Sequence, residues 1–530
     1  MGNITDAHRT LIDAQKVTPA PPLPRVPKGV ALLAFAELWE RFSYFAILAL
    51  LTLFLSADTA IGGWGWQPHD AILFYGLYAG LAYALPIFGS WIANNHLGEQ
   101  RCIMIGVWLF FFGHLLLASP NVIPVIAGYL TGVDSTKILL ATHLPQGLLW
   151  DLTTVQQAVQ LTGATSDEAF ISLWVYVISG GGFYLGLTCL LLATGFFKST
   201  AASLVTKFFP EADARRDAGF AILFTAIYTG AILANVVAGG LGESLGWSYG
   251  FGAAALGMSL GIIALVLKRK SWLGNVGTVP DLKLAFTETG NRIPLSTVDR
   301  DRLSVLLVQS ICTTIYAAAF FQKGGLLSVY TRDFVDRNVL GGTIPVTWML
   351  SISTIVFMVA TPTLAWFFLS LAQRNANPSA SKKLIAGLVL IAFAYGLLAF
   401  AEWTRVDTSS NAVHIIWIII VFALFGIADA LIWPSQLALA SKLAPKSHQT
   451  IVIGAWHLTV AFGVWTASLY GSLSRSTDLF ELFFGTASSC LVAALFLKIS
   501  HRWMTQRLHG AERTGILPTI SDPPITISRQ

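Results

Sequence analysis

The chain alternates long apolar stretches with short polar ones. A helix needs about 20 mainly apolar residues to cross a membrane, and about twelve stretches of this kind occur among the 530 residues. The earlier ones lie near residues 29–56, 69–93, 102–119, 171–197, 218–240 and 247–267. The later ones lie near residues 303–322, 344–372, 384–401, 412–433, 449–472 and 479–499. We therefore predict an all-α membrane protein with twelve transmembrane helices.

Composition supports this prediction. Hydrophobic residues make up 55% of the chain, charged residues only 12%, and the mean hydropathy is +0.66. Soluble proteins carry about 25% charged residues. The net charge of +5 would favour nucleic-acid binding in a soluble protein, but in a membrane protein the positions of the basic residues matter more. We expect the chain to meet a lipid bilayer and no nucleic acid.

The basic residues also indicate orientation and domain boundaries. Most Lys and Arg residues lie on the same side as the N-terminus, which the positive-inside rule places in the cytoplasm. The resulting division is a cytoplasmic tail 1–28, an N-terminal six-helix bundle 29–267, a basic cytoplasmic linker 268–302, a C-terminal six-helix bundle 303–499 and a cytoplasmic tail 500–530. We expect a multi-pass protein of the cell (inner or plasma) membrane. The long exterior connection 120–168 is expected to act as a cap rather than as a binding domain.

A weak internal repeat supports two related halves. The stretch SLVTKFFPEA, residues 203–212, resembles ALASKLAPKS, residues 438–447, at an offset of about 235 residues. Lys207 then corresponds to Lys442, and the fourth and fifth spans correspond to the tenth and eleventh. Parallel repetition of six helices is the plan of the major facilitator fold, which binds its substrate between the halves near the midplane.

The first apolar stretch contains three charges in the sequence FAELWERFSYF. Glu37, Glu40 and Arg41 are spaced i, i+3 and i+4, so they share one face of a helix. A charge at the bilayer centre costs at least about 2.5 kcal/mol and normally faces the protein interior with a partner. A static ion-pair network is one interpretation. We favour a proton-handling site, because two acids against one base leave a carboxyl free to change protonation.

Three further charges lie in or next to apolar stretches. Lys198 precedes more helical sequence, so it need not mark the water interface, whereas Lys323 is expected at an exterior helix end with its ammonium snorkelling to water. Asp429 has no Lys or Arg within four residues. Its partner must therefore be another helix, water or a substrate, and we favour a cationic group on the substrate.

These residues carry a family resemblance. The sequence ELWERFSYF resembles the ExxERFxYY signature of the proton-dependent oligopeptide transporter (POT) family, within the major facilitator superfamily. Four other segments are similar to family segments in the same order: FYGLYAGLAYALPIFGSWIANNHLGEQR, RRDAGFAILFTAIYTGAIL, GWSYGFGAAALGM and SKLAPKSHQTIVIGAWHL. The resemblance implies a major facilitator fold and proton-coupled peptide transport.

The resemblance also implies roles for particular residues. Glu37, Glu40 and Arg41 match the proton-coupling triad of the family, and Tyr44 matches its pocket tyrosine. The residues that the resemblance implies to bind substrate are Arg41, Tyr44, Lys198, Asp429 and Trp456. By this resemblance, Lys198 and Arg41 would bind the peptide carboxylate, and Asp429 would bind the peptide amino group.

The chain departs from the family pattern mainly in the pocket. Gln322 and Lys323 stand where the family has an acid followed by glutamine. Tyr228 and Ser353 each replace a usual asparagine, and Trp433 replaces a small residue. We include Tyr228, Gln322, Ser353 and Trp433 among the candidate substrate-binding residues. The proton machinery is thus expected to be kept while substrate choice is altered.

The predicted function is a symporter that imports di- or tripeptides, or modified peptide-like compounds, by alternating access. A transporter-like receptor that binds without accumulating its ligand, or a symporter for a non-peptide amino-acid conjugate, are the alternatives. An enzyme is not expected, because HExxH and P-loop motifs are absent from the sequence. No metal or other cofactor is expected, with protons as the coupling ion.

Overall fold

The computed structural model describes residues 26–132, 166–209, 215–280, 295–374, 376–407, 412–445 and 449–511. Within these ranges, 12 helices are long and apolar enough to cross a membrane, which confirms the predicted number of spans. Most of both predicted tails, much of the connection 120–168 and the middle of the linker 268–302 lie outside the described residues.

The first six spans are built from helices that several short breaks divide. The described elements of this half are α2 (Lys28–Ser56), η1 (Thr59–Ile61), α3 (Pro68–Ala84), α4 (Pro86–Ile92), η2 (Ala93–Leu97), α5 (Glu99–Ala118), η3 (Ser119–Asn121), α6 (Ile123–Thr131), α9 (Ser166–Thr206), α10 (Arg215–Leu233), η4 (Ala234–Gly239), α11 (Gly240–Leu245), α12 (Trp247–Lys268) and η5 (Arg269–Leu273). The fourth span continues past the predicted end at residue 197, so Lys198 lies inside α9.

The last six spans follow the same pattern. Their described elements are α13 (Thr297–Phe320), η7 (Phe321–Gly324), α14 (Leu326–Phe334), β1 (Val335–Asp336), β2 (Asn338–Val339), β3 (Gly342–Thr343), α15 (Val346–Gln373), α16 (Ala380–Asp407), β4 (Val413–His414), α17 (Ile415–Leu443), α18 (Gln449–Ser472), η9 (Leu473–Arg475) and α19 (Leu479–Arg507). The strands are two residues each: β2 and β3 form a hairpin, and β1 pairs in parallel with β4.

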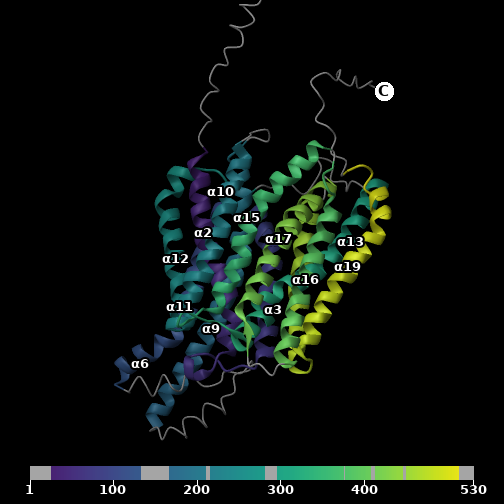
Figure 1. Ribbon diagram of the computed structural model, residues 1–530. Coiled ribbons are helices and arrows are strands. Elements are labelled where there is room, and N and C mark those ends of the chain that lie inside the picture. Colours follow the sequence, from purple (N-terminus) through teal and green to yellow (C-terminus); the bar gives the residue numbers. More distant parts are fainter. Residues whose placement is uncertain are drawn as a thin grey trace, which may run out of the picture.

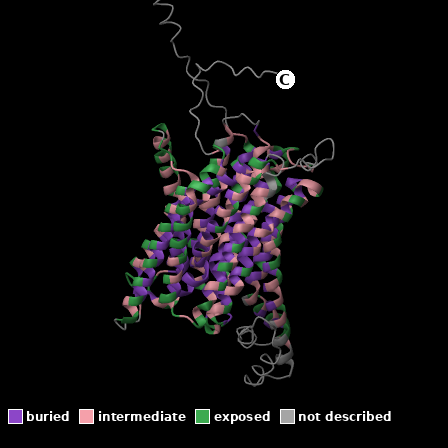
Figure 2. Cartoon of the chain, turned by 90° about the vertical axis from the view of Figure 1, so that its right-hand side faces the viewer, coloured by how far each residue is buried: buried purple, intermediate pink, exposed green. Residues whose placement is uncertain are grey.

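The helices lie lengthwise in one bundle, with the purple to teal helices α2, α10 and α12 on the left of Figure 1 and the green to yellow helices α16, α17 and α19 on the right. Buried residues concentrate along the middle of the bundle, as Figure 2 shows, while the outside carries most exposed ones. We call the face at which α2 begins the inner face, after the expected cytoplasmic side, and the opposite one the outer face.

Local sequence explains where individual helices begin. The seventh span opens with a capping box, in which the Ser296 hydroxyl accepts from the Asp299 backbone N–H and the Asp299 carboxylate accepts from the Ser296 N–H. These bonds satisfy N–H groups that a helix start leaves without partners. Near the middle of the same span, η7 separates α13 from α14, so one transmembrane segment runs from Thr297 to Phe334 with a tighter turn inside it.

Side chains near the outer face join the two halves. The Thr52 hydroxyl of α2 donates to the Gly324 carbonyl at 2.7 Å, and Arg332 of α14 donates to the Ser56 hydroxyl at 2.7 Å. Glu243 of α11 accepts the backbone N–H groups of Val346 and Thr347, each at 2.8 Å. These four hydrogen bonds connect first-half helices to α14, α15 and η7, and they hold the halves together toward the outer face.

Helices α3 and α18 also pack closely across the two halves. The absence of side chains at Gly76 and Gly80 makes this possible, because a Cβ at Gly76 would collide with Ser468 and one at Gly80 with Trp465. Small residues let membrane helices approach at backbone distance, where dispersion contacts accumulate. This seam places the tyrosines of α3 beside the space between the halves.

Candidate functional site

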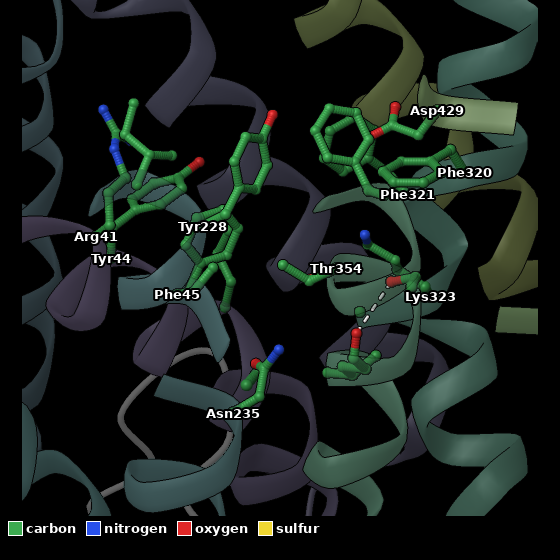
Figure 3. Close-up of a pocket in the computed structure, with 18 of the residues that line it drawn as sticks. Arg41, Tyr44, Phe45, Tyr228, Asn235, Phe320, Phe321, Lys323, Thr354 and Asp429 are labelled. Carbon is green, nitrogen blue, oxygen red and sulfur yellow. Dashed lines mark hydrogen bonds between the residues drawn. The ribbon is translucent and has the colours of Figure 1, made fainter. Parts of the chain in front are cut away.

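A cavity of about 220 Å³ lies between the two halves. Its walls combine α2, α3, α9 and α10 with η7, α15 and α17. Figure 3 shows Arg41, Tyr44 and Tyr228 on one side and Lys323 and Asp429 on the opposite side. Among the described lining residues, the Lys, Arg, Asp and Glu side chains are Arg41, Lys198, Lys323 and Asp429. The cavity therefore presents a few charges in a mainly apolar and aromatic surface, which is typical of a small-molecule site.

The three charges of α2 form one buried cluster beside this cavity. Arg41 Nε donates to Glu37 Oε1 at 2.8 Å and lies 3.1 Å from Glu40 Oε2. The exposed fractions of Glu37, Glu40 and Arg41 are only 2%, 0% and 5%. Helix α10 covers the cluster closely, because Gly230 has no side chain to collide with α2 at Arg41 Cβ. The predicted shared helix face thus brings the triad together, with Arg41 lining the cavity.

Glu40 differs from Glu37 in its hydrogen bonds. The single hydrogen on Arg41 Nε goes to Glu37, and within the described residues both carboxylate oxygens of Glu40 are buried without a hydrogen-bond donor. A buried carboxylate without donors is costly, whereas a protonated one carries no charge and donates a hydrogen itself. Of the two acids, Glu40 is therefore better suited to gain and lose a proton.

Lys198 is held by aromatic ring faces. Its ammonium lies 3.9 Å from the centre of the Tyr83 ring and 5.0 Å from that of Tyr44, which are cation–π distances. None of the described carboxylates lies within 4.0 Å of it. The Arg41 guanidinium also faces the Tyr44 ring, at 5.6 Å. Two cations thus stand on one wall of the cavity with Tyr44 between them.

Asp429 has a partner on another helix. Its Oδ1 accepts a hydrogen bond of 2.6 Å from the Tyr316 hydroxyl of α13. It also interacts electrostatically with Lys323 on the same side of the cavity. Of the partners left open by the sequence, another helix is the one observed, and the role of a substrate amine stays a prediction.

The prediction that Lys323 snorkels at an exterior helix end is wrong. The apolar stretch ends at Gln322, but the transmembrane segment continues through η7 and α14 to Phe334. Lys323 therefore lies well inside the span and lines the cavity, with its ammonium 3.8 Å from the centre of the Phe320 ring. The two glycines that follow allow a break within the helix rather than an end to it.

The other candidate residues are divided between the cavity and the packing behind it. Tyr228, Ser353 and Trp433 line the cavity. Gln322 instead turns toward α19, where its amide donates to the Thr486 hydroxyl at 3.3 Å. Trp456 lies behind Trp433, with ring centres 5.0 Å apart in an edge-to-face arrangement. In this conformation neither Gln322 nor Trp456 is among the residues that line the cavity.

Sequence reasoning missed much of the aromatic wall. Tyr75, Tyr83 and Phe357 line the cavity, and Tyr316 holds Asp429 from behind. Tyr75 and Tyr83 are spaced i, i+8 in the stretch FYGLYAGLAY, a helical spacing that places both on the cavity side of α3. That spacing was available in the sequence, whereas nothing in it linked Tyr316 to Asp429.

His457 lines the cavity as well, and its Nδ1 lies 2.9 Å from the Ile453 carbonyl. A bond to the preceding helical turn is what a packing histidine makes. Among the described residues, no group of three or more His, Cys, Asp or Glu side chains is placed to hold a metal ion. All four cysteines, Cys102, Cys189, Cys312 and Cys490, are free.

Proteins of similar sequence include a peptide transporter and a dipeptide and tripeptide permease. Peptide transporter YePEPT of Yersinia enterocolitica subsp. palearctica serotype O:3 (strain YE-P4) is 24% identical over 524 residues, covering 88% of this chain and 92% of that protein. Dipeptide and tripeptide permease A of Enterobacter sp. (strain 638) is 22% identical over 477 residues, covering 82% of each chain.

Solved structures of similar fold include the peptide transporter POT in complex with sulfate, with a TM-score of 0.73 and 21% identity over 92% of this chain and 97% of that one. A POT family transporter in complex with 5-aminolevulinic acid has a TM-score of 0.74 and 19% identity, over 90% and 97%. These similarities confirm the predicted major facilitator fold. A family model described as the POT family matches residues 100–276 and 293–483, more than half of the chain, so the protein belongs to the POT family.

Proposed function

We propose that this protein is a proton-coupled symporter that imports small peptides or peptide-like compounds by alternating access. It would act in a cell membrane with both termini in the cytoplasm. Two relatives named as peptide transporters support the transport of peptides. A cavity between two six-helix halves, closed by hydrogen bonds toward the outer face, supports alternating access.

The charges of the cavity suit the two ends of a peptide. Arg41 and Lys198 on one wall would bind the carboxylate, which guanidinium and ammonium groups recognise with strong hydrogen bonds. Asp429 on the opposite wall would bind the amino group, with Tyr316 orienting its carboxylate. A peptide bridging the two walls would draw the halves together, which is the differential binding that alternating access needs.

The observation that carries proton coupling is the buried Glu40 carboxylate, which lies 3.1 Å from Arg41 Nε and has no hydrogen-bond donor among the described residues. A proton on Glu40 removes one of the two negative charges that hold Arg41. The guanidinium is then freer to bind a substrate carboxylate beside Lys198. After substrate release on the inner side, deprotonated Glu40 holds Arg41 again.

The energy available is sufficient for uphill transport. One elementary charge that crosses a potential of 100 mV supplies about 2.3 kcal/mol, which corresponds to roughly a fiftyfold accumulation. A pH gradient adds to this value. One proton per peptide therefore suffices for concentrative uptake.

The test is uptake of dialanine into proteoliposomes with an imposed proton gradient. The unmodified protein should accumulate dialanine, and Glu40→Gln should lose accumulation while still exchanging labelled for unlabelled dialanine, because exchange needs no net proton movement. Glu481→Gln, an exposed acid in the first turn of α19, is the matched control and should accumulate normally.

Each alternative has its own outcome in this assay. Undiminished accumulation by Glu40→Gln would exclude Glu40 as the coupling residue. Binding of dialanine by the unmodified protein without any accumulation or exchange would identify a receptor. Accumulation of amino-acid conjugates with no uptake of any peptide would identify a symporter for conjugates.

A further inference from the structure

We propose that basic residues at the inner ends of α2 and α12 bind the phosphate headgroup of an anionic phospholipid, whose acyl chains lie along the exposed face of α12. We call Lys28, Lys268, Arg269 and Lys270 the basic cluster. The site is separate from the central cavity. The inference therefore goes beyond the proposed function and does not depend on which substrate is transported.

The basic cluster lies where two neighbouring helices reach the inner face. Helix α2 begins at Lys28, and α12 ends at Lys268, with Arg269 and Lys270 next in η5. Both helix ends lie at the same end of the bundle in Figure 1. The three lysines are exposed and Arg269 is half-buried. Four positive charges thus stand at the level where membrane helices meet lipid headgroups.

One indole ring gathers ammonium groups from both helices. Lys28 Nζ lies 6.0 Å and Lys268 Nζ 5.9 Å from the centre of the Trp272 ring. These distances are at the limit of a cation–π contact, so the ring compensates the two charges only weakly. Tryptophan is enriched at membrane–water interfaces. The position of Trp272 therefore also favours a location at the headgroup level.

The charges of the basic cluster favour an anionic ligand. Among the described residues, no carboxylate lies within 4.0 Å of any of its four cations. Cations so close together repel one another, and an anion between them removes that repulsion. At a membrane surface, anionic lipids attract such juxtamembrane cations. A phosphodiester shared by Lys28 and Lys268 would accept a charge-assisted hydrogen bond from each helix.

The face of α12 that continues from the basic cluster suits acyl chains. Its exposed apolar side chains are Leu256, Leu260, Ile263 and Leu267. Their spacing of three or four residues places them on one side of the helix. This stripe ends next to Lys268, so a headgroup bound at the basic cluster would lead its chains onto the stripe. A soluble phosphate compound would lack these contacts, which is why we assign the site to a lipid.

Packing holds the two helix ends in place relative to each other. A Cβ at Gly29 would lie 2.9 Å from the Trp272 carbonyl oxygen, so η5 packs directly on the start of α2. Deeper in the membrane, a Cβ at Gly257 of α12 would lie 2.8 Å from the Trp39 ring of α2. The separation of Lys28 and Lys268 is therefore set by the fold. Such a preorganised pair binds a shared ligand at a smaller entropic cost.

The experiment compares two lipids with identical acyl chains, phosphatidylglycerol and phosphatidylcholine. Native mass spectrometry of the full-length protein in a neutral detergent gives the Kd of the first bound lipid. The unmodified protein should bind phosphatidylglycerol about 25-fold more tightly, because each of two lysines contributes about fivefold, equivalent to about 1 kcal/mol. In Lys28→Gln/Lys268→Gln the ratio of the two Kd values should fall to about one. In Lys28→Arg/Lys268→Arg the preference should persist.

The matched control is Lys442→Gln/Lys498→Gln, which removes two exposed lysines from α17 and α19. It changes the net charge equally and should keep the 25-fold ratio. An equal fall in this control would show that overall charge governs binding and would overturn the site. Equal Kd values for both lipids in the unmodified protein would also overturn it.

Two further outcomes concern the kind of ligand and the proposed function. Glycerophosphoglycerol, the same headgroup without acyl chains, should not displace phosphatidylglycerol at equal concentration. Displacement would identify a soluble phosphodiester as the ligand and overturn the assignment to a lipid. Lipid binding is measured without substrate or proton gradient, so its failure leaves the proposed symport intact. Failure of dialanine accumulation would likewise leave the lipid site intact.

Discussion

Removal of the Glu243 carboxylate should weaken the closure of the outer face. Glu243 belongs to α11 of the first half, and it accepts the N–H groups of Val346 and Thr347 at the start of α15 in the second half. Pro345, the residue before α15, gives no side-chain cap of its own. The carboxylate thus caps a helix of the opposite half, where the partial positive charge of the helix end favours an anion.

The magnitude follows from these two bonds. A hydrogen bond to a charged group contributes about 1.5–3 kcal/mol, so two bonds at the lower end of this range contribute about 3 kcal/mol. That energy corresponds to roughly a hundredfold change in the equilibrium between closed and open outer faces. Arg337 Nη1 lies 4.0 Å from Glu243 Oε2. Burial lowers the pKa of Arg337 and the nearby Glu243 raises it, so Glu243→Ala also removes a charge partner.

The assay is a distance measurement across the outer face. Spin labels at Ile61 and Leu340, which are 65% and 103% exposed, would report the separation of the two halves. The distance between the labels is measured by double electron–electron resonance. Glu243→Ala should populate longer distances, and Glu243→Gln should give a smaller effect because its single carbonyl oxygen is an uncharged acceptor. Glu481→Ala, an exposed acid within one half, is the control. An unchanged distance distribution in Glu243→Ala would refute the reasoning.

Two further predictions follow from packing. Tyr83→Leu removes the ring face whose centre lies 3.9 Å from the Lys198 ammonium. The preference for dialanine over its carboxamide, measured as the ratio of the two Kd values, should therefore fall about fivefold, or about 1 kcal/mol. Tyr83→Phe keeps the ring and should keep the preference. Gly76→Ala should lower the melting temperature in detergent by overpacking α3 against α18, at a cost of about 1–3 kcal/mol. Gly396→Ala, where a Cβ meets nothing within 4 Å, should not lower it, and equal loss in both variants would contradict the packing explanation.

The spans and the triad could be predicted because their signals are local. An apolar stretch of about 20 residues has few alternatives to a membrane helix, and the i, i+3, i+4 spacing of Glu37, Glu40 and Arg41 fixes their common face in any helix. Burial of that face followed from the cost of exposing charges to lipid. These inferences required no knowledge of how the helices pack.

The interior of the site depended on packing and could not be predicted in the same way. The side that Gln322 and Lys323 face is set by the η7 turn, whose rotation per residue differs from that of an α-helix. The partner of Asp429 comes from Tyr316, 113 residues earlier in the chain. Trp456 is covered by Trp433. The position of each of these side chains depends on a contact with a neighbouring helix. A single sequence does not show which helices are neighbours.

The hydrogen bond from Thr52 to the Gly324 carbonyl has a consequence for how the outer face opens. The break at η7 interrupts the regular ladder of the span, and the donor for this carbonyl comes from the other half. Separation of the halves would leave the Gly324 carbonyl oxygen without this hydrogen-bond donor in an apolar environment, at a cost of about 1–3 kcal/mol. Water that reaches η7 would offset this cost, so we expect the break to become hydrated as the outer face opens.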